Sequence, residues 1–130
     1  MNAVGSTPRL LAIDDNSDSA ELIARVASKC GYEARAIVDA RDLSDIIGDW
    51  NPDVLTLDLC MPDDDGVSVI SMLKRSGFRG RLIIVSGQDG WLRKTASRLA
   101  EAHGLSVVDD LAKPVELSAL RTLLGNLKAA

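Results

Sequence analysis

The sequence is poor in aromatic residues and cysteine, and it has no long apolar run. Aromatic residues make up 3% of the 130 residues and hydrophobic residues 46%, so the core must be aliphatic. Cys30 and Cys60 are too few for a disulfide scaffold and form no Cys-x-x-Cys pair, which favours reduced thiols. No apolar run reaches the roughly 18 residues of a membrane span. Residues 1–8 lack the basic and apolar segments of a signal peptide, so we expect a cytoplasmic protein.

An excess of negative charge limits the classes of partner. The formal net charge is −4, which argues against direct nucleic-acid binding, since a standalone nucleic-acid binder usually presents a basic face. The length fits one domain, and a chain of this size buries roughly two thirds of its unfolded surface. We expect a flexible tail at residues 1–8 and a single domain at 9–128, because no linker or internal repeat divides the sequence.

Short apolar runs alternate five times with stretches of helical periodicity. The predicted strands are 10–13, 32–38, 54–57, 81–85 and 105–108, and the predicted helices are 17–29, 41–50, 67–75, 91–102 and 116–127. Asn16 or Ser17 is expected to cap the first helix and Gly31 to end it. Polar residues interrupt the second strand, which favours a position near an edge. Strands that alternate with helices predict an α/β fold, a five-stranded parallel sheet with helices on both faces.

Reactive side chains follow four of these predicted strands. Asp14 and Asp15 come after the first strand, Asp58 after the third, Ser86 after the fourth and Lys113 after the fifth. In an open parallel sheet, ligands bind beyond the carboxyl ends of the strands. The fold would therefore bring these distant residues to one edge of the sheet.

Three carboxylates at one edge require a compensating positive charge. At about 4 Å and an effective dielectric constant of about 20, each like-charged pair costs on the order of 4 kcal/mol. Lys113 supplies one positive charge, and all-oxygen ligation suits Mg²⁺ as a second source. Asp58 can then act as a nucleophile that forms an acyl phosphate. The cation and Lys113 would stabilise the charge on the transferring group, and Ser86 could donate to a phosphoryl oxygen.

These residues occur in a pattern known from one family. The pattern consists of Asp14-Asp15, Asp58-x-x-Met61-Pro62-x-x-x-Gly66, Ser86-Gly87 and Lys113-Pro114. In this the chain resembles the CheY-like receiver domains of response regulators, over about residues 9–127. The resemblance implies a (βα)5 flavodoxin-like fold. It also implies a function in two-component signal transduction, with Asp58 as the phosphoacceptor and a histidine kinase or histidine phosphotransfer protein as the donor.

The resemblance also implies individual roles at the site. Asp15 and Asp58 would bind Mg²⁺ directly, Asp14 through water, and the backbone carbonyl of Cys60 would complete the metal site. The phosphoryl group would be bound by three further residues, Ser86, Gly87 and Lys113. Such a domain promotes its own phosphorylation and dephosphorylation and is not a turnover enzyme. The Lys113–Pro114 peptide is expected to be cis.

One position departs from the family pattern. The family usually has Tyr or Phe three residues before the lysine, and that ring turns inward on activation. Here the position is Asp110, which cannot be buried as an aromatic ring can. The conformational change on activation would therefore be transmitted from the site in a different way. The positions that tune phosphoryl lifetime in the family are Cys60 and Gln88, and neither predicts a lifetime.

Other functions remain as alternatives. A Mg²⁺-dependent phosphohydrolase with an aspartate nucleophile usually carries a second aspartate two residues later, where this chain has Cys60. An interaction module that works without phosphorylation would not need the complete set of site residues, although Asp110 leaves room for one. An EF-hand calcium loop with its glycine at Gly66 is excluded, because the loop would begin at Met61 and end at Met72, and methionine cannot bind calcium at those ligand positions. A dinucleotide site is not expected, because no glycine-rich loop follows the first strand. The output domain or target, the cognate kinase and the oligomeric state stay open.

Overall fold

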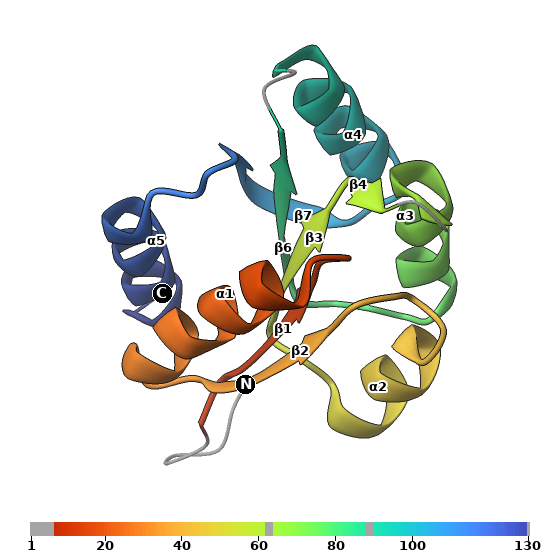
Figure 1. Ribbon diagram of the computed structural model, residues 1–130. Helices are drawn as coiled ribbons and strands as arrows, with labels where there is room; N and C mark the ends of the chain where they lie inside the picture. The colour runs from red at the N-terminus through yellow and green to blue at the C-terminus, as the bar shows by residue number, and fades with distance from the viewer. Residues whose placement is uncertain (1–6, 62–63, 88–89, 130) are drawn as a thin grey trace.

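The described part of the chain forms a five-stranded sheet, a two-stranded hairpin and five helices (Figure 1). The computed structural model describes residues 7–61, 64–87 and 90–129. The elements in chain order are β1 (Arg9–Ile13), α1 (Ser17–Lys29), β2 (Glu33–Ile37), α2 (Leu43–Trp50), β3 (Val54–Asp58), β4 (Cys60–Met61), β5 (Asp64–Asp65), α3 (Gly66–Arg75), β6 (Arg81–Ser86), α4 (Gly90–Ala102), β7 (Ser106–Ala112) and α5 (Leu117–Ala129).

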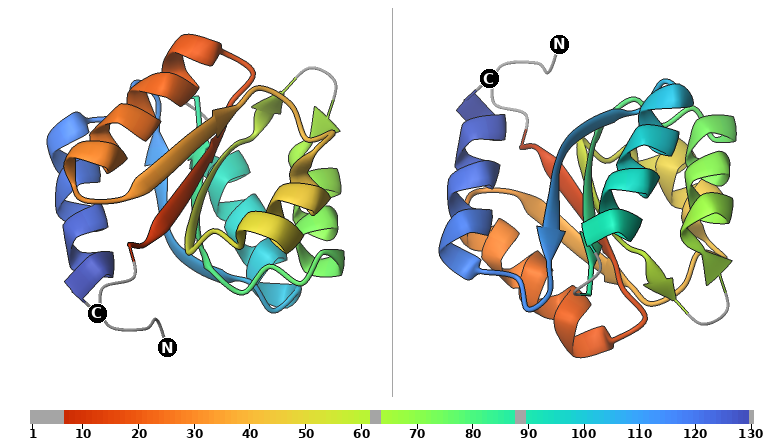
Figure 2. Two further views of the ribbon diagram at one scale, coloured as in Figure 1. Left: turned by 90° about the horizontal axis from the view of Figure 1, so that it is seen from below. Right: turned by 90° about the horizontal axis from the view of Figure 1, so that it is seen from above.

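The main sheet has the strand order β2-β1-β3-β6-β7, and all neighbouring strands pair in parallel. Helices α1 and α5 cover one face, and α2, α3 and α4 cover the other, as both views in Figure 2 show. The predicted fold class is therefore confirmed. Strand β2 lies at an edge, as its interspersed polar residues predicted.

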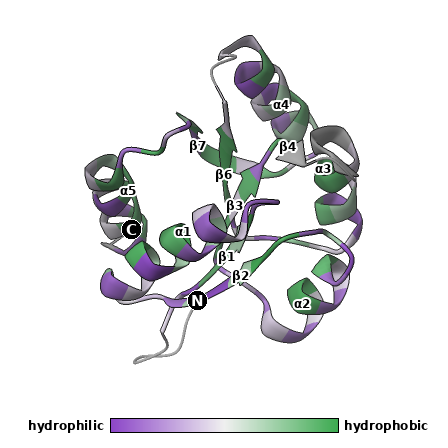
Figure 3. Ribbon diagram, viewed as in Figure 1, coloured by the Kyte–Doolittle hydropathy of each residue, from purple (hydrophilic) through white to green (hydrophobic). Residues whose placement is uncertain are grey.

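The central strands are apolar because both of their faces are covered (Figure 3). Strand β3 is buried along its whole length, and β6 is buried from its second residue. Successive side chains point to opposite faces, so β1 supplies Leu11 and Ile13 to the core under α2–α4 and Leu10 and Ala12 to the core under α1 and α5. The aliphatic side chains packed on both faces of the sheet hold the carboxyl ends of the strands in register.

The boundaries of α1 follow from local chemistry. The side chain of Asn16 accepts a hydrogen bond from the Ser19 amide, so Asn16 is the cap. Gly31 follows the last turn with a φ of +92°, a left-handed conformation that suits glycine. The Lys128 ammonium group donates to the carbonyl of Cys30 at 3.0 Å and so ties α5 to this helix end.

The structure differs from the sequence prediction at β7, at residues 59–66 and at the start of α2. Strand β7 runs to Ala112, whereas the sequence predicted its end at 108, because the polar Asp109 and Asp110 interrupt the apolar pattern without interrupting the pairing with β6. The predicted loop at 59–66 contains the short antiparallel pair β4–β5. Helix α2 begins two residues later than predicted, because the Asp39 carboxylate accepts the Arg41 amide and forms a turn first.

Some predictions concern positions outside the described residues. These are residues 1–6 of the expected tail, Pro62 of the family pattern and Gln88. Among the helices of the described part, none has the length and apolar character needed to cross a membrane.

Candidate functional site

The structure brings the predicted site residues together at the carboxyl edge of the sheet. Asp14 directly follows β1, Asp58 ends β3, Ser86 ends β6 and Lys113 directly follows β7. The parallel register aligns these ends, with Asp58 opposite Val85. The sequence argument from strand ends therefore predicted the location of the cluster correctly.

Lys113 lies between the two buried carboxylates. Its Nζ is 2.8 Å from Asp14 Oδ2 and 3.1 Å from Asp58 Oδ2. Asp14 is 1% exposed and Asp58 is 2% exposed, so neither charge is solvated by bulk water. Removing a charge from water costs several kcal/mol unless a partner compensates. Lys113 is that partner for both carboxylates.

The charged groups of the site shift one another's pKa values. Burial raises the pKa of the Asp14 carboxyl, and the nearby Asp58 raises it further, while hydrogen bonds from Lys113 and the Asn16 amide act in the opposite direction. For Lys113, burial alone would lower the pKa of the ammonium group, but the hydrogen bonds and charges of Asp14 and Asp58 outweigh it and raise the pKa. The lysine is therefore fully charged at neutral pH.

Three carboxylates form a group that could hold a metal ion. Oxygen atoms of Asp14, Asp15 and Asp58 all lie within 4.8 Å of one another. Asp15 is exposed, so the group is open to solvent on one side. With all groups ionised, three carboxylates and one ammonium leave a formal charge of −2, three minus one. Hard oxygen ligands and this residual charge fit a divalent cation such as Mg²⁺.

Ser86 offers a buried hydroxyl group close to the carboxylates. The residue is 1% exposed, and its Oγ has no hydrogen-bond partner among the described residues. Buried hydroxyl groups are nearly always hydrogen-bonded, so one left unsatisfied calls for an explanation such as a ligand. The Ser86 carbonyl accepts a hydrogen bond from the Lys113 amide at 2.6 Å, which keeps the two site segments side by side.

The backbone that follows Asp58 and Lys113 has two defined features. The Leu59 amide donates to the Val85 carbonyl at 3.0 Å, so the chain stays beside β6 for one residue beyond Asp58. Cys60 comes next, in β4, where it pairs with Asp65. The Lys113–Pro114 peptide is cis, as expected.

Arg93 is a residue that the sequence analysis missed. It lies in α4, donates from Nη1 to the Gly87 carbonyl at 2.8 Å, and places Nε 3.4 Å from Asp110 Oδ1. Asp110, at the position where the family usually has an aromatic ring, is thus held by an ion pair. The sequence carried no signal for this contact, since the two residues lie on separate elements and arginines are frequent on exposed helix faces.

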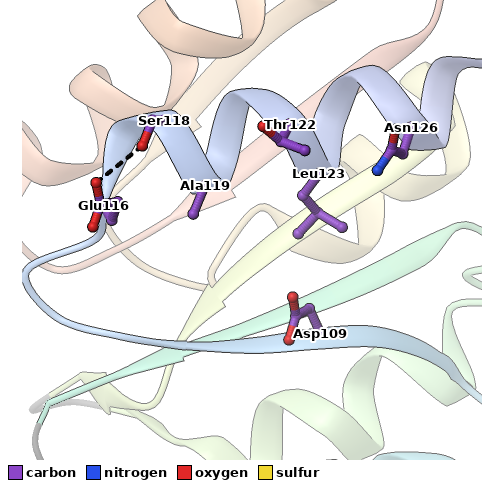
Figure 4. A pocket seen from close by; sticks show the side chains of 7 residues that line it. All are labelled: Asp109, Glu116, Ser118, Ala119, Thr122, Leu123 and Asn126. Atoms are coloured by element: carbon purple, nitrogen blue, oxygen red, sulfur yellow. Dashed lines mark hydrogen bonds between the residues drawn. The ribbon is translucent and has the colours of Figure 1, made fainter.

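Two hollows lie near the site and α5. A cavity of about 140 Å³ opens beside Asp14 and Lys113, between α1 and the start of α5, and Leu22 and Leu117 contribute apolar walls. A wider groove of about 570 Å³ runs along α5 and includes Asp109 of β7 (Figure 4). The residues that line this groove include none of the site residues, whereas the smaller cavity adjoins Asp14 and Lys113.

Comparison with known proteins agrees with the fold and shows the family. Residues 10–125 match the family model of the response regulator receiver domain. The chain is 31% identical over 121 residues to response regulators MprA of Mycolicibacterium vanbaalenii and Mycobacterium avium. The match covers 93% of this chain and 49% and 50% of those two relatives, so the chain spans about half their length.

Solved structures of receiver domains have a similar fold. A response regulator from Colwellia psychrerythraea is similar with a TM-score of 0.83 and 27% identity, covering 95% of this chain and 98% of that one. A signal receiver domain from Bermanella marisrubri has a TM-score of 0.76 and 27% identity, covering 95% and 99%. The chain therefore belongs to the family of response regulator receiver domains, the signalling domains of two-component systems.

Proposed function

We propose that Asp58 accepts a phosphoryl group from a histidine kinase or a histidine phosphotransfer protein. The observation that carries this proposal is a buried carboxylate 3.1 Å from the Lys113 ammonium. A buried Ser86 hydroxyl, which has no hydrogen-bond partner in the described part of the chain, ends the neighbouring strand. An acyl phosphate on Asp58 needs a cation and a donor next to its phosphoryl oxygens, and these two side chains provide both.

The reaction is a displacement at phosphorus. A carboxylate oxygen of Asp58 attacks the phosphorus of an N-phosphorylated histidine on the donor. The new P–O bond forms as the P–N bond breaks, and the electron pair of that bond stays on the imidazole nitrogen. Lys113 compensates the charge of the transferring group, and the Ser86 hydroxyl donates to one of its oxygens.

The metal site is part of the same proposal. Asp15 and Asp58 would hold Mg²⁺ directly, with the Cys60 carbonyl as a further ligand and Asp14 acting through water. Mg²⁺ supplies positive charge that offsets repulsion between the carboxylates and an incoming phosphoryl group. Asp14 keeps its position through two contacts, the Asn16 amide at 2.9 Å and the Lys113 ammonium at 2.8 Å.

Phosphorylation would shift the domain between two conformations that a partner or an attached output domain distinguishes. Hydrolysis of the acyl phosphate would return the domain to its starting state. The competing phosphohydrolase function lacks support at one position, since Cys60 stands where such an enzyme needs an acid/base aspartate.

Intact-mass measurement tests the proposal. The protein is incubated with Mg²⁺ and acetyl phosphate, and a gain of one phosphoryl group is expected. Asp58→Asn should abolish the gain, whereas Asp45→Asn, which changes an exposed aspartate of α2, should label like the wild type. A wild-type protein that labels neither with small donors nor with a cognate kinase would contradict the proposal. Rapid phosphate release from unrelated esters would favour the hydrolase.

A further inference from the structure

Arg93 joins the end of β6 to β7 through one side chain. Its Nη1 donates to the carbonyl of Gly87 at 2.8 Å, and its Nε lies 3.4 Å from Asp110 Oδ1. Gly87 directly follows Ser86, whose buried hydroxyl belongs to the candidate site. The side chains of Arg93 and Asp110 are only 16% and 26% exposed, so water screens their ion pair less than it would screen one on the open surface.

A bulge in β7 is what turns Asp110 toward Arg93. Val107 packs in the core under α2–α4, and strict alternation would place Asp109 and Leu111 on that same face. The pairing with β6 slips by one residue after Val107, so the alternation reverses. As a result, Asp109 faces the groove along α5 (Figure 4), Leu111 packs in the core under α1 and α5, and Asp110 reaches Arg93 on α4.

We infer that Arg93 couples phosphorylation of Asp58 to β7 and α4 through the Gly87 carbonyl and the Asp110 carboxylate. The inference rests on the proposed function. When the Ser86 hydroxyl moves to bond a phosphoryl group on Asp58, the adjoining Gly87 backbone moves with it. The donors of a guanidinium group are fixed in one plane, so displacing the acceptor of one donor disturbs the bond made by the other.

This route differs from the direct backbone route between the same strands. The Ser86 carbonyl already accepts the Lys113 amide at 2.6 Å, so any movement of Ser86 reaches Lys113 without Arg93. Asp110 lies three residues earlier, and its carboxylate is held by Arg93. An ion pair thus takes the position where receiver domains usually carry an aromatic ring. Movement of Arg93 would also shift the start of α4, where Trp91 is 74% exposed.

Nuclear magnetic resonance can separate the two routes. Backbone amide shifts are recorded with and without Mg²⁺ and beryllium fluoride, which forms a tetrahedral mimic of the acyl phosphate on a carboxylate. In the wild type we expect responses at Asp58, Lys113, Arg93 and Asp110. In Arg93→Met the responses of residue 93 and of Asp110 should fall severalfold, while the Lys113 response stays. Arg98→Met, an exposed arginine of the same helix, serves as the matched control and should keep all responses.

A second variant tests the order of the contacts. Asp110→Ala keeps the bond from Arg93 to Gly87, so the Arg93 response should persist while that of residue 110 falls. A wild-type-sized Asp110 response in Arg93→Met, together with responses at Asp58 and Lys113, would overturn the inference and leave the proposed function intact. Absence of any response at Asp58 in the wild type would overturn both.

Discussion

Replacing Lys113 by methionine should destabilise the metal-free protein and make its stability strongly dependent on Mg²⁺. The variant keeps the length of the side chain and removes the ammonium group that lies 2.8 Å from Asp14 and 3.1 Å from Asp58. Both carboxylates would then stay buried without a counter-charge. Breaking a buried ion pair by removing one partner costs about 3–5 kcal/mol.

The expected magnitude is somewhat smaller than for a fully buried pair. The Lys113 side chain is 28% exposed, so water can reach part of the space it leaves. We expect a loss of about 2–3 kcal/mol in the free energy of unfolding, or a fall in Tm on the order of 10 °C for a domain of this size. A divalent cation bound to the same carboxylates should recover more than half of this loss, because ligand binding to the folded state adds to its stability.

Urea unfolding followed by circular dichroism measures this effect, once with EDTA and once with Mg²⁺. Lys94→Met, which changes an exposed lysine of α4, is the control and should unfold like the wild type. The raised pKa of Lys113 means that its contribution is complete below the ordinary lysine value of 10.5 and is lost only above it. The difference between variant and wild type should therefore persist across neutral pH. An equal difference in EDTA and Mg²⁺, or a loss below about 0.5 kcal/mol in EDTA, would refute the reasoning.

Three further changes test other parts of the structure. The pKa of Asp14 lies above its ordinary value of 3.8, so the folded state holds this proton more tightly than the unfolded state does. The free energy of unfolding of the metal-free protein should therefore fall as pH rises through that pKa. Asp14→Asn should flatten this pH dependence in urea unfolding measured at several pH values. Tyr32→Phe removes a buried hydrogen bond of 2.7 Å to the Leu124 carbonyl and should cost about 1 kcal/mol in the same assay, whereas an unchanged midpoint would contradict this role. Gly31→Ala should lower the free energy of unfolding by about 1 kcal/mol or more, because φ is +92° and the new methyl group would meet the Lys128 side chain. A variant more stable than the wild type would contradict this expectation.

The sequence was sufficient to predict the sheet and most of the site because both follow from short-range rules. Apolar runs identify the strands of a covered parallel sheet. Polar residues immediately after those runs then fall at one edge of that sheet, which is how Asp14 and Asp58 were found. Lys113 was found in the segment that follows the fifth predicted strand. The charge argument needed only the proximity of the carboxylates, and the structure gives that proximity as 4.8 Å or less.

The features that escaped prediction depend on contacts between separate elements. The length of β7 is set by its pairing with β6, which continues past two aspartates that a pattern of apolar residues treats as a break. The contact between Arg93 and Asp110 depends on the one-residue slip in that pairing, which decides the face to which Asp110 points. No local pattern reveals such a slip, so the partner of Asp110 was visible only in three dimensions.

The proposed function requires that Asp58, and no other carboxylate of the cluster, carries the phosphoryl group. Reduction of the phosphorylated protein with borohydride converts an acyl phosphate into the corresponding alcohol, which turns the modified aspartate into homoserine. Peptide mass spectrometry then locates that residue. We expect homoserine at position 58 and aspartate at positions 14 and 15. Homoserine at either of those two positions, or a labelled protein without homoserine, would contradict the proposed function.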